Sequence, residues 1–126
     1  MSNQIFLGNH ILAEYHVCNA KLLNDSDFLE KTLLESAKKA GANVISSHFH
    51  AFSPVGITGI VLIAESHFSI HTWPEHQYAA VDFFTCSPKM NFQIAYDWLA
   101  NALESEKHFF KSILRGQISN YTGKTD

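Results

Sequence analysis

Polar and apolar residues alternate along several stretches of the chain, and this pattern predicts most of its strands. The alternation is clear in residues 9–18 and 78–85, as in a half-buried strand. Residues 60–63 are continuously apolar, which is typical of a buried strand. The predicted strands cover residues 9–18, 43–52, 60–63, 68–73, 78–85 and 109–114.

Two other segments carry apolar residues at helical spacing. The first helix is predicted to begin at the N-cap residues 24–27 and to end before Gly41, a residue favoured just past a helix. The second has one apolar face between Phe92 and Leu103. The order of strand, helix, four strands, helix and strand predicts an α+β two-layer sandwich, a mainly antiparallel sheet with two helices on one face. Without internal repeats or linkers, residues 1–126 are predicted to form a single domain.

Composition then excludes several classes of protein. Hydrophobic residues make up 46% of the 126 positions and charged residues 17%, enough apolar material for a core. A net charge of −3 without a basic patch argues against nucleic acid or a membrane surface as a partner. The longest apolar run, residues 60–64, is too short to cross a bilayer, and the N-terminus does not resemble a signal peptide. We therefore expect a cytoplasmic protein.

Histidine is unusually frequent, with eight residues in the chain. His48 and His50 fall on one face of a predicted strand, and imidazole is a common zinc ligand. The spacing is not specific, because neither HExxH nor CxxC is present. Zinc binding stays an alternative and we expect no metal. His10, His16 and His108 are interpreted as ordinary surface or edge positions.

Residues 65–76 hold the densest chemistry, with three hydroxyls, three imidazoles and two carboxylates in twelve residues. Cys86 follows one strand later. A serine or cysteine near histidine can act in nucleophilic catalysis. A GxSxG elbow is absent and an acidic partner for a triad is not evident. These residues by themselves predict a small enzyme and leave its nucleophile open.

The same region resembles the processing and active-site signature of the prokaryotic S-adenosylmethionine decarboxylase proenzymes. The matching pieces, in order, are ESH (65–67), IHTWPE (70–75), YAAVD (78–82) and FTC (84–86). The resemblance extends through LGNHILAEYHVC near the start, LLND before the first helix and AKKAGA at its end. It reaches to about Gly116 without large insertions.

The resemblance implies that the chain makes its own covalent cofactor. The Ser66 hydroxyl would attack the carbonyl of Glu65 and replace the peptide bond with an ester. β-Elimination would then cleave the chain into residues 1–65 and 66–126 and leave dehydroalanine, which hydrolyses to a pyruvoyl group. His71 matches the proton acceptor of this processing. Thr58 matches a supporting position where the family commonly carries serine; its hydroxyl is kept, but the extra methyl restricts its rotamers.

The resemblance also assigns residues to the mature enzyme. The pyruvoyl group from Ser66 would form a Schiff base with the substrate amine and act as an electron sink. Cys86 matches the proton donor to the decarboxylated carbon. Phe52 and Phe68 match positions beside the adenine ring, and Glu75 matches a carboxylate that binds the ribose hydroxyls.

The implied reaction converts S-adenosylmethionine to CO2 and decarboxylated S-adenosylmethionine. The decarboxylated product would be the aminopropyl donor for spermidine. The family's small form acts as a homodimer of cleaved protomers with active sites at the interface, so we expect a homodimer here. Two alternatives remain open from the residues. The same scaffold could decarboxylate ornithine or arginine, or the chain could be a regulatory subunit that never cleaves.

Overall fold

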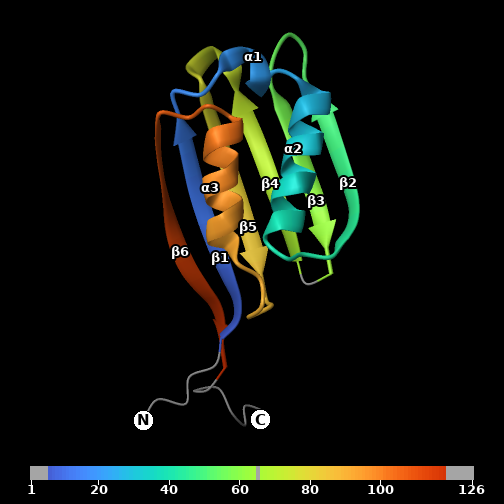
Figure 1. Cartoon of the computed structure of the whole chain (residues 1–126), viewed down its shortest axis with the longest axis vertical. Coiled ribbons are helices and arrows are strands. Elements are labelled where there is room, and N and C mark those ends of the chain that lie inside the picture. Colours follow the sequence, from blue (N-terminus) through green and yellow to red (C-terminus); the bar gives the residue numbers. More distant parts are fainter. Residues whose placement is uncertain (1–5, 65, 119–126) are drawn as a thin grey trace, which may run out of the picture.

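A six-stranded antiparallel sheet forms the body of the molecule (Figure 1). The computed structural model describes residues 6–64 and 66–118. Its strands are β1 (Phe6–His16), β2 (Val44–Ala51), β3 (Ile57–Ile63), β4 (Ser66–Trp73), β5 (Tyr78–Thr85) and β6 (Lys107–Gln117). Their order across the sheet is β2-β3-β4-β5-β1-β6. The first strand of the chain, β1, therefore lies between β5 and β6.

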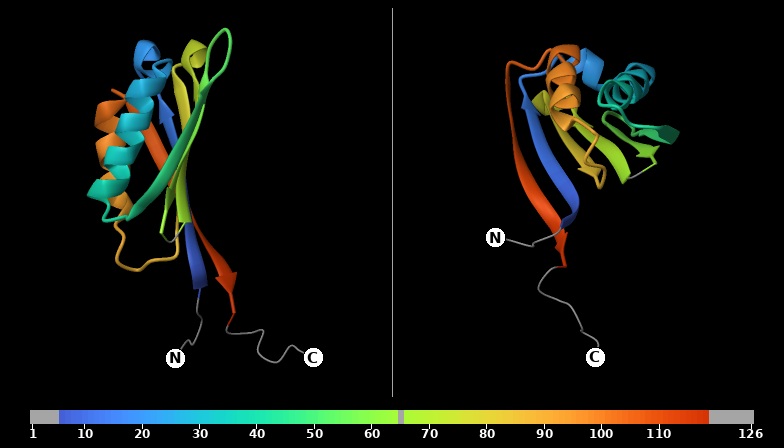
Figure 2. Two further views of the ribbon diagram at one scale, coloured as in Figure 1. Left: turned by 90° about the vertical axis from the view of Figure 1, so that its right-hand side faces the viewer. Right: turned by 60° about the horizontal axis from the view of Figure 1, so that its bottom comes forward.

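The helices lie on one side of this sheet, as the side view in Figure 2 shows. They are α1 (Ala20–Leu23), α2 (Ser26–Lys39) and α3 (Phe92–Ala102), with a 3-10 turn, η1 (Pro74–His76), between β4 and β5. The predicted α+β sandwich is confirmed, with α2 and α3 as its two predicted helices. The four-residue α1 was not predicted, because it is too short to show a helical period.

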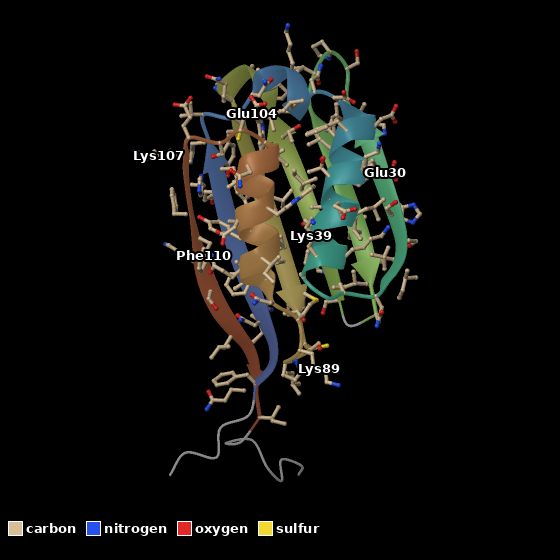
Figure 3. The ribbon with its side chains drawn as sticks, viewed as in Figure 1. Glu30, Lys39, Lys89, Glu104, Lys107 and Phe110 are labelled. Carbon is tan, nitrogen blue, oxygen red and sulfur yellow. The ribbon has the colours of Figure 1, made fainter. Side chains whose placement is uncertain are left out.

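The core fills the space between the helices and alternate residues of the strands. Phe68 and Phe83 are fully buried there, with ring centroids 4.7 Å apart in an edge-to-face arrangement. At the edge of the sheet, the β6 residue Phe110 packs against Phe92 and Tyr96 of α3 (Figure 3). The opposite face of the sheet, here called the open face, carries the other alternate residues of each strand.

The bounds of β1 and β6 differ from the predictions. Alternation continues to Cys18, but β1 ends at His16 because Val17 adopts a left-handed backbone with φ of 54°. The last strand, β6, extends beyond the predicted 109–114 on both sides because it pairs with β1 along its whole length. Residues 119–126 lie outside the described residues.

Candidate active site

Ser66 opens β4 directly after a tight hairpin turn. Ile63 of β3 pairs with Ser66, so two residues, Ala64 and Glu65, make the connection. The amide of Ala64 donates to the Asn43 carbonyl at 2.9 Å, which fixes the approach to the turn. The predicted cleavage residue Glu65 itself lies outside the described residues. The half-buried Ser66 therefore sits at one end of the sheet, next to the bond that the resemblance marks for cleavage.

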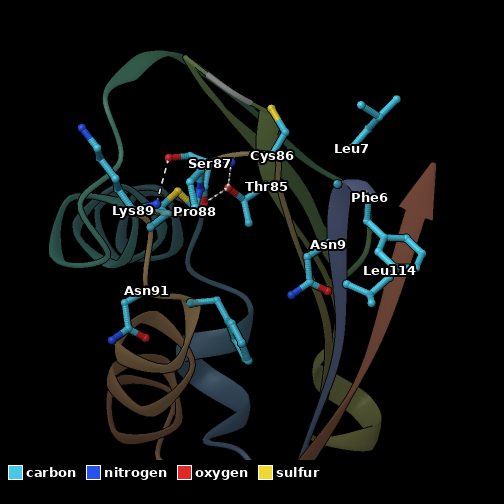
Figure 4. A pocket seen from close by; sticks show the side chains of 13 residues that line it. Phe6, Leu7, Asn9, Thr85, Cys86, Ser87, Pro88, Lys89, Asn91 and Leu114 are labelled. Atoms are coloured by element: carbon cyan, nitrogen blue, oxygen red, sulfur yellow. Dashed lines mark hydrogen bonds between the residues drawn. The ribbon is translucent and has the colours of Figure 1, made fainter. Parts of the chain in front are cut away.

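Cys86 lies beside this serine, one residue past the end of β5. Ser66 Oγ and Cys86 Sγ are 4.0 Å apart, and the thiol is exposed. A hollow of about 700 Å³ opens next to Cys86, between Asn9 of β1 and the loop that leads to α3 (Figure 4). We call Ser66 and Cys86 the serine–cysteine pair. The structure thus brings together two of the predicted catalytic residues that are 20 positions apart in the sequence.

The remaining polar candidates gather at the opposite end of the sheet, around a pocket of about 250 Å³ that we call the upper pocket. It is lined by Phe52, Val55, Gly56, Ile57, Thr58, His71, Thr72, Trp73 and Glu75. Thr58 Oγ1 and His71 Nδ1 are 3.1 Å apart, within hydrogen-bond distance. Phe52 is 51% exposed. Four residues predicted for processing or substrate binding therefore share one site.

Phe68 does not share that site. Its side chain is fully buried under the helices, on the face opposite His71. A ligand on the surface can reach Phe68 only through its backbone unless the core opens. Trp73, the last residue of β4, is 41% exposed and also lines the upper pocket.

The serine–cysteine pair and the upper pocket are far apart within one chain. Ser66 and His71 are five positions apart on β4, about 17 Å at the usual rise per strand residue. An odd separation along a strand also places the two side chains on opposite faces. A single copy therefore does not bring the His71 imidazole to the Ser66 hydroxyl.

A polar cluster on the open face was missed by the sequence analysis. His10 Nε2 lies 3.4 Å from an Asp82 carboxylate oxygen, and the Ser69 hydroxyl donates to the other oxygen at 3.0 Å. The expectation that His10 is an ordinary surface position is wrong, because its Nε2 is fully covered. Burial, and then the nearby His10, lower the pKa of His67, while Asp82 acts in the opposite direction. The three strands that carry these groups are brought side by side by strand pairing, which sequence spacing does not reveal.

Metal binding finds no support among residues 6–64 and 66–118. Within these ranges, no three histidine, cysteine, aspartate or glutamate side chains gather closely enough to hold an ion. The part of the chain that the structure describes also contains no helix long and apolar enough to cross a membrane.

Helices back one face of the antiparallel sheet, a hydroxyl lies next to a thiol at one of its ends, and a separate pocket at the other end carries aromatic and polar side chains. This arrangement defines the class of small α+β enzymes. The chain belongs to the S-adenosylmethionine decarboxylase family, since the model of that family matches residues 9–116.

Similar proteins agree with this assignment. S-adenosylmethionine decarboxylase proenzymes from Clostridium kluyveri and Oceanobacillus iheyensis are each 48% identical to this chain over 110 residues, 87% of either length. Among solved structures, the adenosylmethionine decarboxylase from Aquifex aeolicus VF5 aligns with a TM-score of 0.80 and 38% identity. The alignment covers 88% of this chain and 92% of that one. The family resemblance read from the motifs is confirmed over nearly the whole chain.

Proposed function

We propose that this chain is a self-processing, pyruvoyl-dependent enzyme that decarboxylates S-adenosylmethionine. The observation that carries the proposal is the serine–cysteine pair, with Ser66 first in its strand after a two-residue turn and the Cys86 thiol 4.0 Å away. In the proposed processing, the Ser66 hydroxyl would attack the carbonyl of the preceding residue, Glu65, and in the mature enzyme the Cys86 thiol would be the acid that returns a proton.

The residues fit a pyruvoyl group formed at position 66. Ser66 is half-buried at the rim of the sheet, so a group there is reachable by substrate while one side stays covered. Such a group would supply an electron sink for the electrons released with CO2. The Cys86 thiol, 4.0 Å from Ser66 Oγ, would return the proton, which is the role that its position in the family pattern implies.

His71 is the proposed proton acceptor of self-processing, and Thr58 is its hydrogen-bond partner. When His71 carries its proton on Nδ1 and donates it to Thr58 Oγ1, the Nε2 atom is left free as a base. The Thr58 hydroxyl thus orients the imidazole ring. Such orientation would be its supporting role in processing, the role implied by its match to a position where the family commonly carries serine.

A second copy of the chain completes the proposed site. The two predicted halves lie at opposite ends of β4, and a two-fold axis that crosses the strands reverses their direction in the partner. Pairing two open faces about such an axis would bring the end of β4 that carries Ser66 in one copy near the upper pocket of the other. We therefore propose a homodimer whose two active sites each use residues of both copies.

The open face has the character of an interface. An aromatic row crosses four strands there, from Trp73 through Tyr78 and His16 to Phe109, with neighbouring centroids 4.9 to 6.0 Å apart. Trp73 and Phe109 remain more than 40% exposed, as does Ile113. Exposed apolar side chains that share one face are typical of surfaces that another protein covers.

S-adenosylmethionine is favoured over ornithine or arginine by the upper pocket. The exposed Phe52 ring can stack on a base, and the exposed Glu75 carboxylate can accept hydrogen bonds from two ribose hydroxyls. A basic amino acid offers neither partner. The names of the relatives, all S-adenosylmethionine decarboxylase proenzymes, support the same substrate. The product would serve as aminopropyl donor for spermidine synthesis.

Mass spectrometry under denaturing conditions tests self-processing. The purified chain should appear as two pieces, residues 1–65 and a pyruvoyl-started 66–126, whereas the Ser66→Ala variant should stay whole at 14.2 kDa. CO2 release measured with S-adenosylmethionine, ornithine and arginine tests the substrate. A wild-type chain that stays intact favours the regulatory-subunit alternative, and release from ornithine or arginine alone contradicts the proposed substrate.

A further inference from the structure

The loop that joins β2 to β3 forms one wall of the upper pocket. We call residues 52–57 the pocket loop; Phe52, Val55, Gly56 and Ile57 all line the pocket. The Phe52 amide donates to the Gly56 carbonyl at 2.8 Å, which closes the loop on itself. Thr58, the partner of His71, follows directly. The position of this loop therefore sets where two candidate functional residues stand.

Two neighbouring amides of the pocket loop are held by side chains from elsewhere in the fold. The Gly56 amide donates to Asn24 Oδ1 at 3.0 Å. The next amide, that of Ile57, donates to Thr72 Oγ1, also at 3.0 Å. A backbone stretch whose successive amides meet fixed acceptors loses freedom that a loop of this kind otherwise keeps.

The two acceptors are themselves linked. The Thr72 hydroxyl donates to the Leu23 carbonyl at 2.8 Å, and Leu23 precedes Asn24 at the end of α1. Thr72 is 5% exposed and Leu23 is fully buried, so this part of the assembly is anchored in the core. Thr72 also sits between His71 and Trp73 on β4, with its side chain on the opposite face. One hydroxyl thus ties α1, the pocket loop and β4 together.

We propose that Asn24 and Thr72 are positioning residues of the upper pocket. They hold the pocket loop so that Phe52 meets a bound nucleoside and Thr58 meets His71, and they act through the backbone of Gly56 and Ile57 rather than on substrate. The proposal rests on the proposed function, and it gives a role to the LLND segment (22–25) that the resemblance left without one.

Paired variants test the role of Asn24 and Thr72 through its effect on substrate binding. Thr72→Val and Asn24→Ala remove an acceptor and should raise the KM for S-adenosylmethionine about three- to tenfold, the loss expected for one positioning hydrogen bond. The kcat per cleaved chain should stay within about twofold, because the serine–cysteine pair is untouched. Thr72→Ser and Asn24→Asp keep an acceptor oxygen and should restore most of the affinity. The inhibition constant of 5′-methylthioadenosine should follow the same order.

Asp25→Ala is the matched control. Asp25 is the neighbour of Asn24 and caps α2, because its side chain accepts from the Phe28 amide at 3.0 Å, whereas the Asn24 side chain accepts from the Gly56 amide of the pocket loop. It should lower the Tm and leave KM unchanged. If Asn24→Ala behaves like Asp25→Ala, with lower Tm and unchanged KM, the proposal is overturned. Asn24 is exposed, so its variant provides this test even if Thr72→Val does not fold.

Amide hydrogen exchange separates this inference from the proposed function. The Gly56 and Ile57 amides should exchange faster in Asn24→Ala than in Asp25→Ala, whether or not the chain decarboxylates anything. Equal exchange rates of these amides in the two variants overturn the proposal that Asn24 holds the pocket loop. A wild-type chain that stays intact and releases no CO2 contradicts the proposed function instead.

Discussion

Ser66 and His71 lie five positions apart on one strand, β4, with their side chains on opposite faces. The hydroxyl lies with Cys86 at one end of the sheet, and the imidazole lies with Thr58 at the other. A mechanism that needs both groups at one bond therefore needs two copies of the chain.

Co-expression of Ser66→Ala and His71→Ala chains should restore cleavage that neither variant shows alone. In a mixed dimer, one site joins the intact Ser66 of the His71→Ala chain to the intact His71 of its partner. With random pairing, roughly half of the His71→Ala chains should be cleaved. Denaturing mass spectrometry of the mixture measures this fraction. A His71→Ala chain that cleaves fully by itself, or a mixture without any cleavage, rules out a shared site.

Thr58 should control the rate of processing. Thr58→Val keeps the branched shape and removes the hydroxyl 3.1 Å from His71 Nδ1, so the ring loses its orienting partner. We expect cleavage to slow about tenfold or more, within the range in which general-base catalysis contributes. A time course of intact mass after synthesis in vitro provides the rate. Thr58→Ser is the control and should process at least as fast as wild type, since it keeps the hydroxyl with freer rotamers.

The two pieces of the cleaved chain should remain one folded unit. Cleavage at residue 65 leaves β1 in the first piece, yet β1 lies between β5 and β6 of the second and pairs with both. The new ends do not interrupt those ladders. Native size-exclusion chromatography should recover both pieces in one peak, and separation should need denaturant. Pieces that part in buffer alone would contradict the strand order.

Stability should fall in mild acid because of His67. Its pKa is lowered in the folded state, first by burial and then by His10, so the unfolded chain binds the proton more readily. The loss begins as pH falls through the ordinary histidine pKa, about 6.5, and is complete below the lowered folded value. Thermal unfolding between pH 8 and pH 5 measures it. His67→Gln removes the titrating group and should show a smaller decrease in Tm over that range; an equal decrease would assign the effect to other groups.

Much of the fold could be read from the pattern of the chain. The strand over 78–85 is found with the predicted bounds, and α2 begins after the predicted cap at Asp25. Both are signalled by patterns among residues close in sequence: alternation for the strand and a capping residue for the helix. The end of β1 could not be predicted, since the left-handed backbone at Val17 belongs to a turn held from outside: its carbonyl accepts from the Glu106 amide.

The sequence alone determined the α+β class, the family and the residue types available for chemistry, because ordered motifs and hydrophobic periods are properties of neighbours along the chain. Only the tertiary structure decided how those residues are grouped. Strand pairing set Ser66 beside Cys86, Thr58 beside His71 and His10 beside Asp82. It also separated the first two groups by the length of β4, since register and sheet order depend on contacts between distant segments.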